Sequence, residues 1–203
     1  MADVALGLKA HSGWAALVAL SIERHLPQVW ERRRIELVVA AEGSWAKQPY
    51  HAAEGLDPRE AEALVRRAVA AARGIAAREV GAAVEALRAE RHEVVGIGVL
   101  IGTGMPGWTV AQILSVHARM HKAEGELFRD ALIQAGEACG LAVARVAERD
   151  LYERAAKDLH LSAGGLLEHV AAIGRTIGPP WSRDQKEAAL AAWLALGRRQ
   201  KVY

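Results

Sequence analysis

The first part of the chain alternates hydrophobic with polar or small positions, as β-strands do. Val4, Leu6 and Leu8 alternate with Ala, Gly and Lys, which is the two-residue period of a half-buried strand. A short turn at 10–13 contains a glycine, and the apolar run 14–20 follows it. Two such runs joined by a short Gly-containing turn predict a β-hairpin.

A third strand is predicted over 35–39, where β-branched residues gather, and the segment 43–56 has the composition of a loop. The motif Asp57-Pro58-Arg59-Glu60 then combines a capping Asp, a Pro at the first helical position and a Glu three residues after the cap. Hydrophobic residues at helical spacing continue through the Ala-rich stretch 58–90. Two internal glycines leave open whether this stretch is one kinked helix or two helices.

Strands and helices alternate in the second half. The continuous apolar run 94–101 predicts a strand buried on both faces, and 141–147 predicts a fifth strand. Helices are predicted over 109–139, 150–159, 166–173 and 182–199, with 162–165 as a loop.

This order predicts an α/β fold. Three sequential strands form an antiparallel meander, and the last two, each reached through a helix, lie parallel to the first. The result is a mixed five-stranded sheet with helices on both faces. We expect a single domain over 1–203, with the helical segment 58–90 inserted between strands three and four.

Composition excludes several classes of protein. The chain has 203 residues, of which 52% are hydrophobic and 25% charged, so neither a disordered nor a collagen-like chain is expected. No run of 18 apolar residues predicts a membrane span, and the first residues do not resemble a secretory signal. The single cysteine, Cys139, cannot form an internal disulfide, which favours a cytoplasmic location. A net charge of +2 does not by itself indicate nucleic-acid binding.

A glycine motif follows the predicted fourth strand. Gly102, Gly104 and Gly107 have the spacing Gly-x-Gly-x-x-Gly between a strand and a helix, where backbone N–H groups can hold a phosphate. Pro106 removes one of those donors, and no acidic residue ends a second parallel strand at the expected distance. A purely structural turn is therefore the alternative.

A polar group is predicted on one face of the helical segment 109–139. His117, His121 and Glu124 are four and three residues apart, so they share a helix face. Two imidazoles one turn apart can bind a metal together, with the carboxylate as a third ligand or a base. Alternatively, these residues line the edge of the core or cap a helix break near Gly125.

Two further features have functional and structural interpretations. Asp184 and Glu187 share a face in the first turn of the last helix and offer hard oxygen ligands to a divalent cation, but the helix dipole favours acids there in any case. Trp30, the run Arg32-Arg33-Arg34 and Trp45 suggest base stacking beside cations, although a solvated sheet edge has the same composition.

Three segments show a family pattern: a first hairpin (5–9 and 13–14), a central helix and strand (123–129 and 140–143) and a closing acidic helix (184–191). Together they resemble the ribonuclease H-like superfamily, and within it the RuvC-type Holliday-junction resolvases and their YqgF-type relatives. The resemblance implies four carboxylates that bind two divalent cations, Mg²⁺ or Mn²⁺, for phosphodiester hydrolysis.

Mapped onto this chain, only part of that acidic site is present. The two acids of the last helix fall on Asp184 and Glu187, whereas the acid of the first strand falls on Lys9 and that of the fourth strand near Gly98. An ammonium group at Lys9 repels a bound cation. The resemblance therefore implies a catalytically degenerate protein, a possible pseudoenzyme, that binds nucleic acid, a small ligand or a protein partner. Lys9, His11, the loop 102–107 and the start of the last helix would converge at the cleft.

Two other functions stay open. In the first, the chain is an active metal-dependent nuclease or other hydrolase with a rearranged site, in which His117, His121 and Glu124 join Asp184 or Glu187 around one metal. In the second, the small side chains of 58–90 make the chain a scaffold or oligomerisation module, such as a homodimer.

Overall fold

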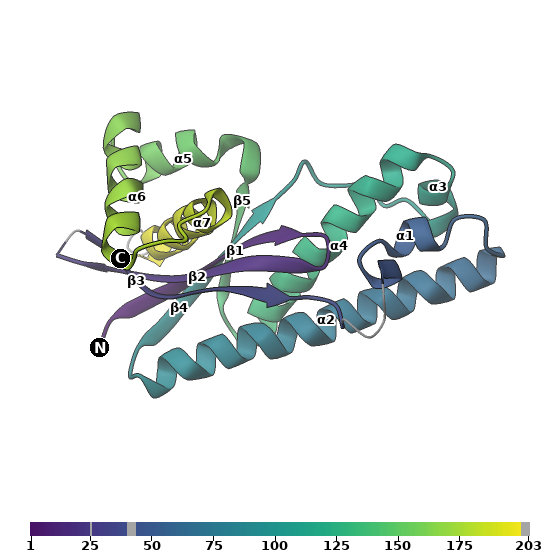
Figure 1. Ribbon diagram of the computed structural model, residues 1–203, viewed down its shortest axis with the longest axis horizontal. Helices are drawn as coiled ribbons and strands as arrows, with labels where there is room; N and C mark the ends of the chain where they lie inside the picture. Colours follow the sequence, from purple (N-terminus) through teal and green to yellow (C-terminus); the bar gives the residue numbers. More distant parts are fainter. Residues whose placement is uncertain (25, 40–43, 200–203) are drawn as a thin grey trace.

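The computed structural model describes residues 1–24, 26–39 and 44–199 (Figure 1). In chain order the elements are β1 (Asp3–His11), β2 (Trp14–Glu23), β3 (Leu26–Glu36), η2 (Ser44–Ala46), α1 (Pro49–Ala52), α2 (Pro58–Ala89), β4 (Glu93–Ile101), α3 (Val110–Leu114), α4 (His117–Ala138), β5 (Ala142–Ala147), η3 (Glu148–Asp150), α5 (Leu151–Asp158), α6 (Ala163–Ile177) and α7 (Arg183–Arg199).

The five strands form one sheet in the order β3-β2-β1-β4-β5. β1 pairs antiparallel with β2 and β2 antiparallel with β3, while β4 and β5 lie parallel to β1. The predicted mixed sheet is therefore confirmed. α2 and α4 cover one face, and α7, with α5 and α6 beside it, covers the other (Figure 1).

β1 is buried on both faces, which differs from the half-buried strand that its alternating pattern predicts. Val4, Leu6 and Leu8 face the core beneath α2 and α4, as expected. Ala5 faces α7 and is fully buried, and Lys9, also buried, lies on the same side. The small and polar positions of β1 thus face a second helical layer rather than solvent.

Two glycines let α7 approach the sheet closely. A Cβ atom at Gly7 would overlap the carbonyl oxygen of Ala188, and one at Gly98 would overlap that of Ala191. Ala and Gly at the contact bring the helix backbone onto the strands. The first turn of α7 is thereby fixed next to the end of β1.

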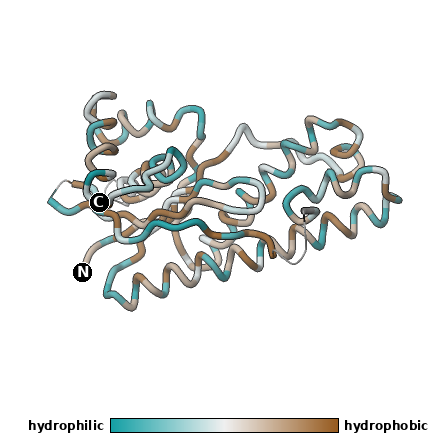
Figure 2. Tube along the Cα trace, in the orientation of Figure 1, coloured by the Kyte–Doolittle hydropathy of each residue, from teal (hydrophilic) through white to brown (hydrophobic). Residues whose placement is uncertain are grey.

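The basic run 32–34 lies within the third strand, ahead of the strand predicted over 35–39. β3 begins at Leu26, not at residue 35, and ends at Glu36, before the predicted strand does. It is an edge strand, and most of its side chains are partly exposed, so polar residues are tolerated along it. Figure 2 shows this long hydrophilic stretch beside more hydrophobic neighbours.

Several helix boundaries also differ from the sequence prediction. The predicted loop 43–56 contains η2 and α1, and 58–90 is the single helix α2, whose buried alanines pack within this chain. The helical segment 109–139 breaks at 115–116 and continues through Gly125. The predicted loop 162–165 is the start of α6, because the Ser162 hydroxyl accepts a hydrogen bond from the Gly165 N–H, 3.0 Å away.

Among the described helices, none is long and apolar enough to cross a membrane.

Candidate functional site

A lysine ammonium lies among three carboxylates at the carboxyl ends of β1 and β5. Lys9 Nζ is 3.1 Å from Glu148 Oε1 and 3.2 Å from Asp184 Oδ1. It also donates a hydrogen bond to Glu187 Oε2. Because Glu148 directly follows β5 and the other two acids lie in the first turn of α7, three separate elements contribute to this group, which we call the Lys9 cluster.

Burial and charge pairing shape the ionisation of the Lys9 cluster. The Lys9 side chain is 8% exposed and that of Glu187 only 2%. Burial alone would lower the pKa of Lys9, but hydrogen bonds to Glu187, Glu148 and Asp184 outweigh it and raise that pKa above its ordinary value. Burial would raise the pKa values of Asp184 and Glu187, yet their cationic neighbours, Lys9 foremost, hold both below the ordinary range.

Two arginines extend the cluster. Arg183 Nε is 2.6 Å from Glu187 Oε1, on the carboxylate oxygen that Lys9 does not bind. Arg129 of α4 is 3.8 Å from Glu148 and 3.2 Å from Glu126. Three cations and four carboxylates therefore meet here, so the group carries only a small net negative charge.

The loop 102–107 lies beside Glu126 and Arg129 of this group. A Cβ at Gly102 would come 2.8 Å from Glu126 Oε1 and 3.0 Å from the Arg129 guanidinium, so the backbone passes close to both side chains. Gly104 has a φ of +72°, which favours glycine, whereas Gly107 has open space around its Cβ position. A phosphate-binding role for this loop stays a prediction.

A stack of flat side chains leads from the sheet edge to the cluster. The Arg34 guanidinium lies 4.3 Å from the centroid of the Trp14 ring. His11 stacks on the same tryptophan at 4.3 Å between centroids, and its Nε2 is 3.2 Å from Asp184 Oδ1. All three arginines of the basic run also have structural partners. Arg34 pairs with Glu36, with 2.6 Å between Nε and Oε1. Arg32 donates to backbone carbonyls of 177–180, and Arg33 pairs with Glu31 and Glu79.

A pocket of about 400 Å³ opens beside Glu187. Burial and the charge of Glu187 raise the pKa of the Tyr152 hydroxyl in its wall. The pocket has both apolar and cationic walls, lined by Tyr152, Leu167, Val170, Ala171, Arg183 and Lys186.

The structure brings together four of the residues singled out in the sequence: Lys9, His11, Asp184 and Glu187. Gly98, near which the fourth-strand acid was mapped, does not join them, because it pairs with Gly7, before the end of the strand, and leaves no room for a side chain beneath α7.

Glu148 and Arg183 were missed by the sequence analysis. Glu148 could have been found from its place directly after a parallel strand, where functional residues of α/β sheets gather. Arg183 is four residues before Glu187 in the same helix, which is the spacing of an intrahelical ion pair.

His117, His121 and Glu124 form a different group, with His51 of α1 as an additional member. Figure 1 places α1 and the start of α4 at one end of the molecule, away from α7. The hypothesis that these histidines share one metal with Asp184 or Glu187 is therefore wrong. Folding α1 onto α4 brings His51 to its partners, and the long sequence separation hides that contact.

The chain matches no protein-family model and no curated protein sequence. Among solved structures it is similar to Thermus thermophilus RuvC in complex with a Holliday junction substrate, with a TM-score of 0.56 and 10% sequence identity over 98% of this chain and 96% of that chain. A second Thermus thermophilus RuvC structure gives a TM-score of 0.55 at 11% identity over the same shares. With its sheet order and both helical layers, this chain has the ribonuclease H-like fold of the RuvC type.

Proposed function

We propose that this chain binds nucleic acid across the carboxyl ends of β1, β4 and β5 and does not carry out two-metal hydrolysis there. The observation that carries the proposal is the Lys9 ammonium, which binds the carboxylates that would otherwise hold divalent ions. Binding without cleavage is the function that this arrangement supports best.

The cluster does not fit a pair of Mg²⁺ ions. Asp184 and Glu187 already form ion pairs with Lys9, and Glu187 also pairs with Arg183. A divalent ion 4 Å from the ammonium would be repelled by roughly 8 kcal/mol at an effective dielectric constant of about 20. In addition, β4 ends at Ile101 and is followed by glycine and threonine rather than by an acid.

Several features of the cleft favour a polyanionic ligand. Two exposed arginines belong to the Lys9 cluster or adjoin it in sequence. Arg183, 80% exposed, pairs with Glu187, and Arg149, 76% exposed, follows Glu148 and pairs with Asp150. The stack of Arg34, Trp14 and His11 provides cationic and aromatic surface of the kind that contacts phosphates and bases. The similar solved structure is that of a protein in complex with a Holliday junction substrate, so branched DNA is the first ligand to test.

Fluorescence anisotropy with a labelled four-way DNA junction, a duplex and a single strand tests this proposal. We expect the junction to bind at 50 mM salt and to weaken steeply towards 200 mM, because phosphate contacts release counterions. Arg149→Ala and Arg34→Ala should each weaken binding and lower the salt slope by about 1. Arg78→Ala is the matched control, because Arg78 is 67% exposed on α2, across the sheet.

Two results with the wild-type chain would contradict the proposal, and a third comes from the variants. One is an absence of salt-dependent binding to all three nucleic acids. The other is junction cleavage by the wild-type chain that disappears with a chelator and returns with Mg²⁺ or Mn²⁺. Equal losses in Arg78→Ala and in the two cleft variants would also refute it, since binding would then follow overall charge rather than this cleft.

A further inference from the structure

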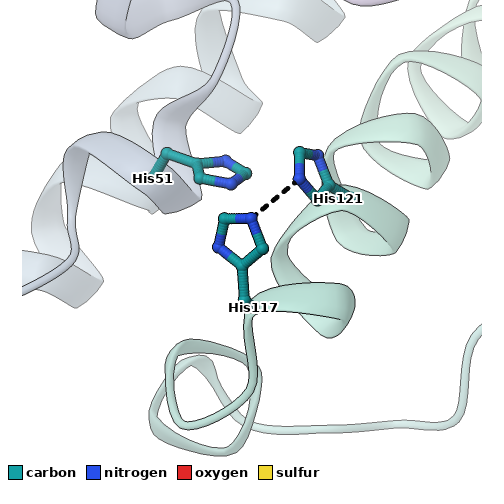
Figure 3. A group of neighbouring side chains, drawn as sticks. All are labelled: His51, His117 and His121. Carbon is teal, nitrogen blue, oxygen red and sulfur yellow. Dashed lines mark hydrogen bonds between the residues drawn. The ribbon is translucent and has the colours of Figure 1, made fainter.

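Three imidazoles converge at the junction of α1 and the first turn of α4, at the end of the molecule away from the Lys9 cluster (Figure 3). One ring nitrogen from each of His51, His117 and His121 lies within 4.8 Å of the others. His117 Nε2 and His121 Nε2 are 3.1 Å apart. Bonds of about 2.0–2.1 Å in a tetrahedral zinc site place two nitrogens roughly 3.3 Å apart, so this pair already has nearly that separation.

A buried carboxylate orients His51. Glu124, whose side chain is 2% exposed, accepts hydrogen bonds from the backbone N–H of His51 at 3.2 Å and from its Nδ1 at 2.8 Å. Because an ionised carboxylate only accepts, Nδ1 is the donor in this contact, and in the neutral imidazole Nε2 then keeps its lone pair. A carboxylate bonded to the far nitrogen of a metal-binding imidazole is the usual arrangement around zinc.

Nε2 of His51 is buried and has no hydrogen-bond donor to accept from among the described residues. Glu124 is a buried acid for which the described part of the chain supplies no Lys or Arg partner. A cation bound at Nε2 would satisfy both needs, because it takes the lone pair and offsets the carboxylate charge through the imidazole.

Apart from the hydrogen bond that they make with each other, no structural role accounts for His117 and His121 among the described residues (Figure 3). His117 and His121 are exposed on the first turns of α4, and Val116, which precedes the helix, provides no side-chain cap. Their mutual contact therefore neither fills the core nor ends the helix. Metal binding would tie α1, a helix of only four residues, to α4.

We propose that His51, His117 and His121 bind one transition-metal ion, Zn²⁺ foremost. Three neutral imidazoles suit Zn²⁺ and similar borderline ions, whereas Mg²⁺ prefers oxygen ligands. Because two of the three ligands are exposed, the fourth coordination position faces solvent and takes water or an anion. Glu124 acts as a positioning residue, not as a ligand. This site is independent of the Lys9 cluster and of the nucleic-acid proposal.

Isothermal titration of the metal-free full chain with ZnCl₂ tests the inference, and Co²⁺ absorption in the visible range reports the coordination geometry. We expect one Zn²⁺ per chain, tetrahedral Co²⁺ bands and no binding of Mg²⁺. His117→Ala and His121→Ala should each lower the Zn²⁺ affinity at least 100-fold. Glu124→Gln should lower it about 10- to 100-fold while keeping one ion per chain.

His160→Asn is the matched control, because His160 is exposed, lies outside the cluster and has a φ of +55° that Asn tolerates. It should leave zinc binding unchanged. Circular dichroism of every variant separates loss of a ligand from loss of the fold. An absence of zinc binding by the wild type, or zinc binding that survives His117→Ala and His121→Ala in folded protein, would overturn the inference.

Discussion

Replacing Lys9 by methionine removes the cation of the Lys9 cluster while keeping a side chain of similar length. Glu187 then stays 2% exposed with only Arg183 as a partner, and Asp184 and Glu148 remain nearby as like charges. Removing one partner of a buried ion pair costs about 3–5 kcal/mol. Because Arg183 and Arg129 still offset part of the charge, we expect the lower end of that range for Lys9→Met, about 3 kcal/mol at pH 7.

Urea unfolding measures this loss. With a slope of about 2–3 kcal/mol/M for a chain of this size, the midpoint should fall by roughly 1 M. Lys157→Met is the control: Lys157 is exposed on α5, and its replacement should change the free energy of unfolding by less than about 0.5 kcal/mol.

The pH dependence separates an electrostatic loss from a packing defect. In the wild type the pKa values of Asp184 and Glu187 are lowered, so their stabilisation is present above their ordinary values of 3.8 and 4.5 and is lost as the pH falls through the folded values. Without Lys9, the crowded carboxylates take up protons more readily in the folded variant. The stability difference should therefore narrow from pH 7 to pH 4.5. A loss below 1 kcal/mol, or one that is independent of pH, would refute this reasoning.

Three other perturbations follow from the same structure. Lys9→Asp restores an acid on β1 beside three carboxylates, so Mg²⁺ should raise its melting temperature but leave that of the wild type unchanged; equal shifts would contradict the Lys9 argument. Gly98→Ala should lower the free energy of unfolding by about 3 kcal/mol or more, because the new Cβ overlaps the α7 backbone. Gly74→Ala has open space in α2 and should raise the free energy of unfolding by about 0.5–1 kcal/mol. Thermal unfolding measures both changes. Since the pKa of Lys9 is raised, its stabilisation is present below 10.5 and lost at higher pH, so the difference in stability between wild type and Lys9→Met should shrink above pH 10.5.

The sheet could be predicted because its signals are local. The alternation in β1, the glycine turn after it and the continuous apolar run of β4 each define a strand within ten residues or so. β3 was placed too late because an edge strand tolerates Arg and Glu at many positions, which removes the hydrophobic pattern. The break after α3 was missed for a related reason: no Gly or Pro marks it.

Residues of the Lys9 cluster could be predicted from the sequence only where they share one helix or match the family pattern. Asp184 and Glu187 share a helix turn, and Lys9 was found because the family pattern has an acid at its position. Glu148 reaches Lys9 only after β5 pairs with β4, and His51 reaches His121 only after α1 folds onto α4. Such contacts depend on tertiary packing, which no local spacing encodes.

The cation of the Lys9 cluster is part of the chain itself, because the ammonium group belongs to a side chain of β1. A bound Mg²⁺ exchanges with the medium, so its occupancy follows the free ion concentration and falls when nucleotides or chelators compete for it. A tethered counter-ion has a fixed local concentration, and chelators cannot remove it. The electrostatics of this cleft are therefore settled when the chain folds and do not depend on the occupancy of an exchangeable ion.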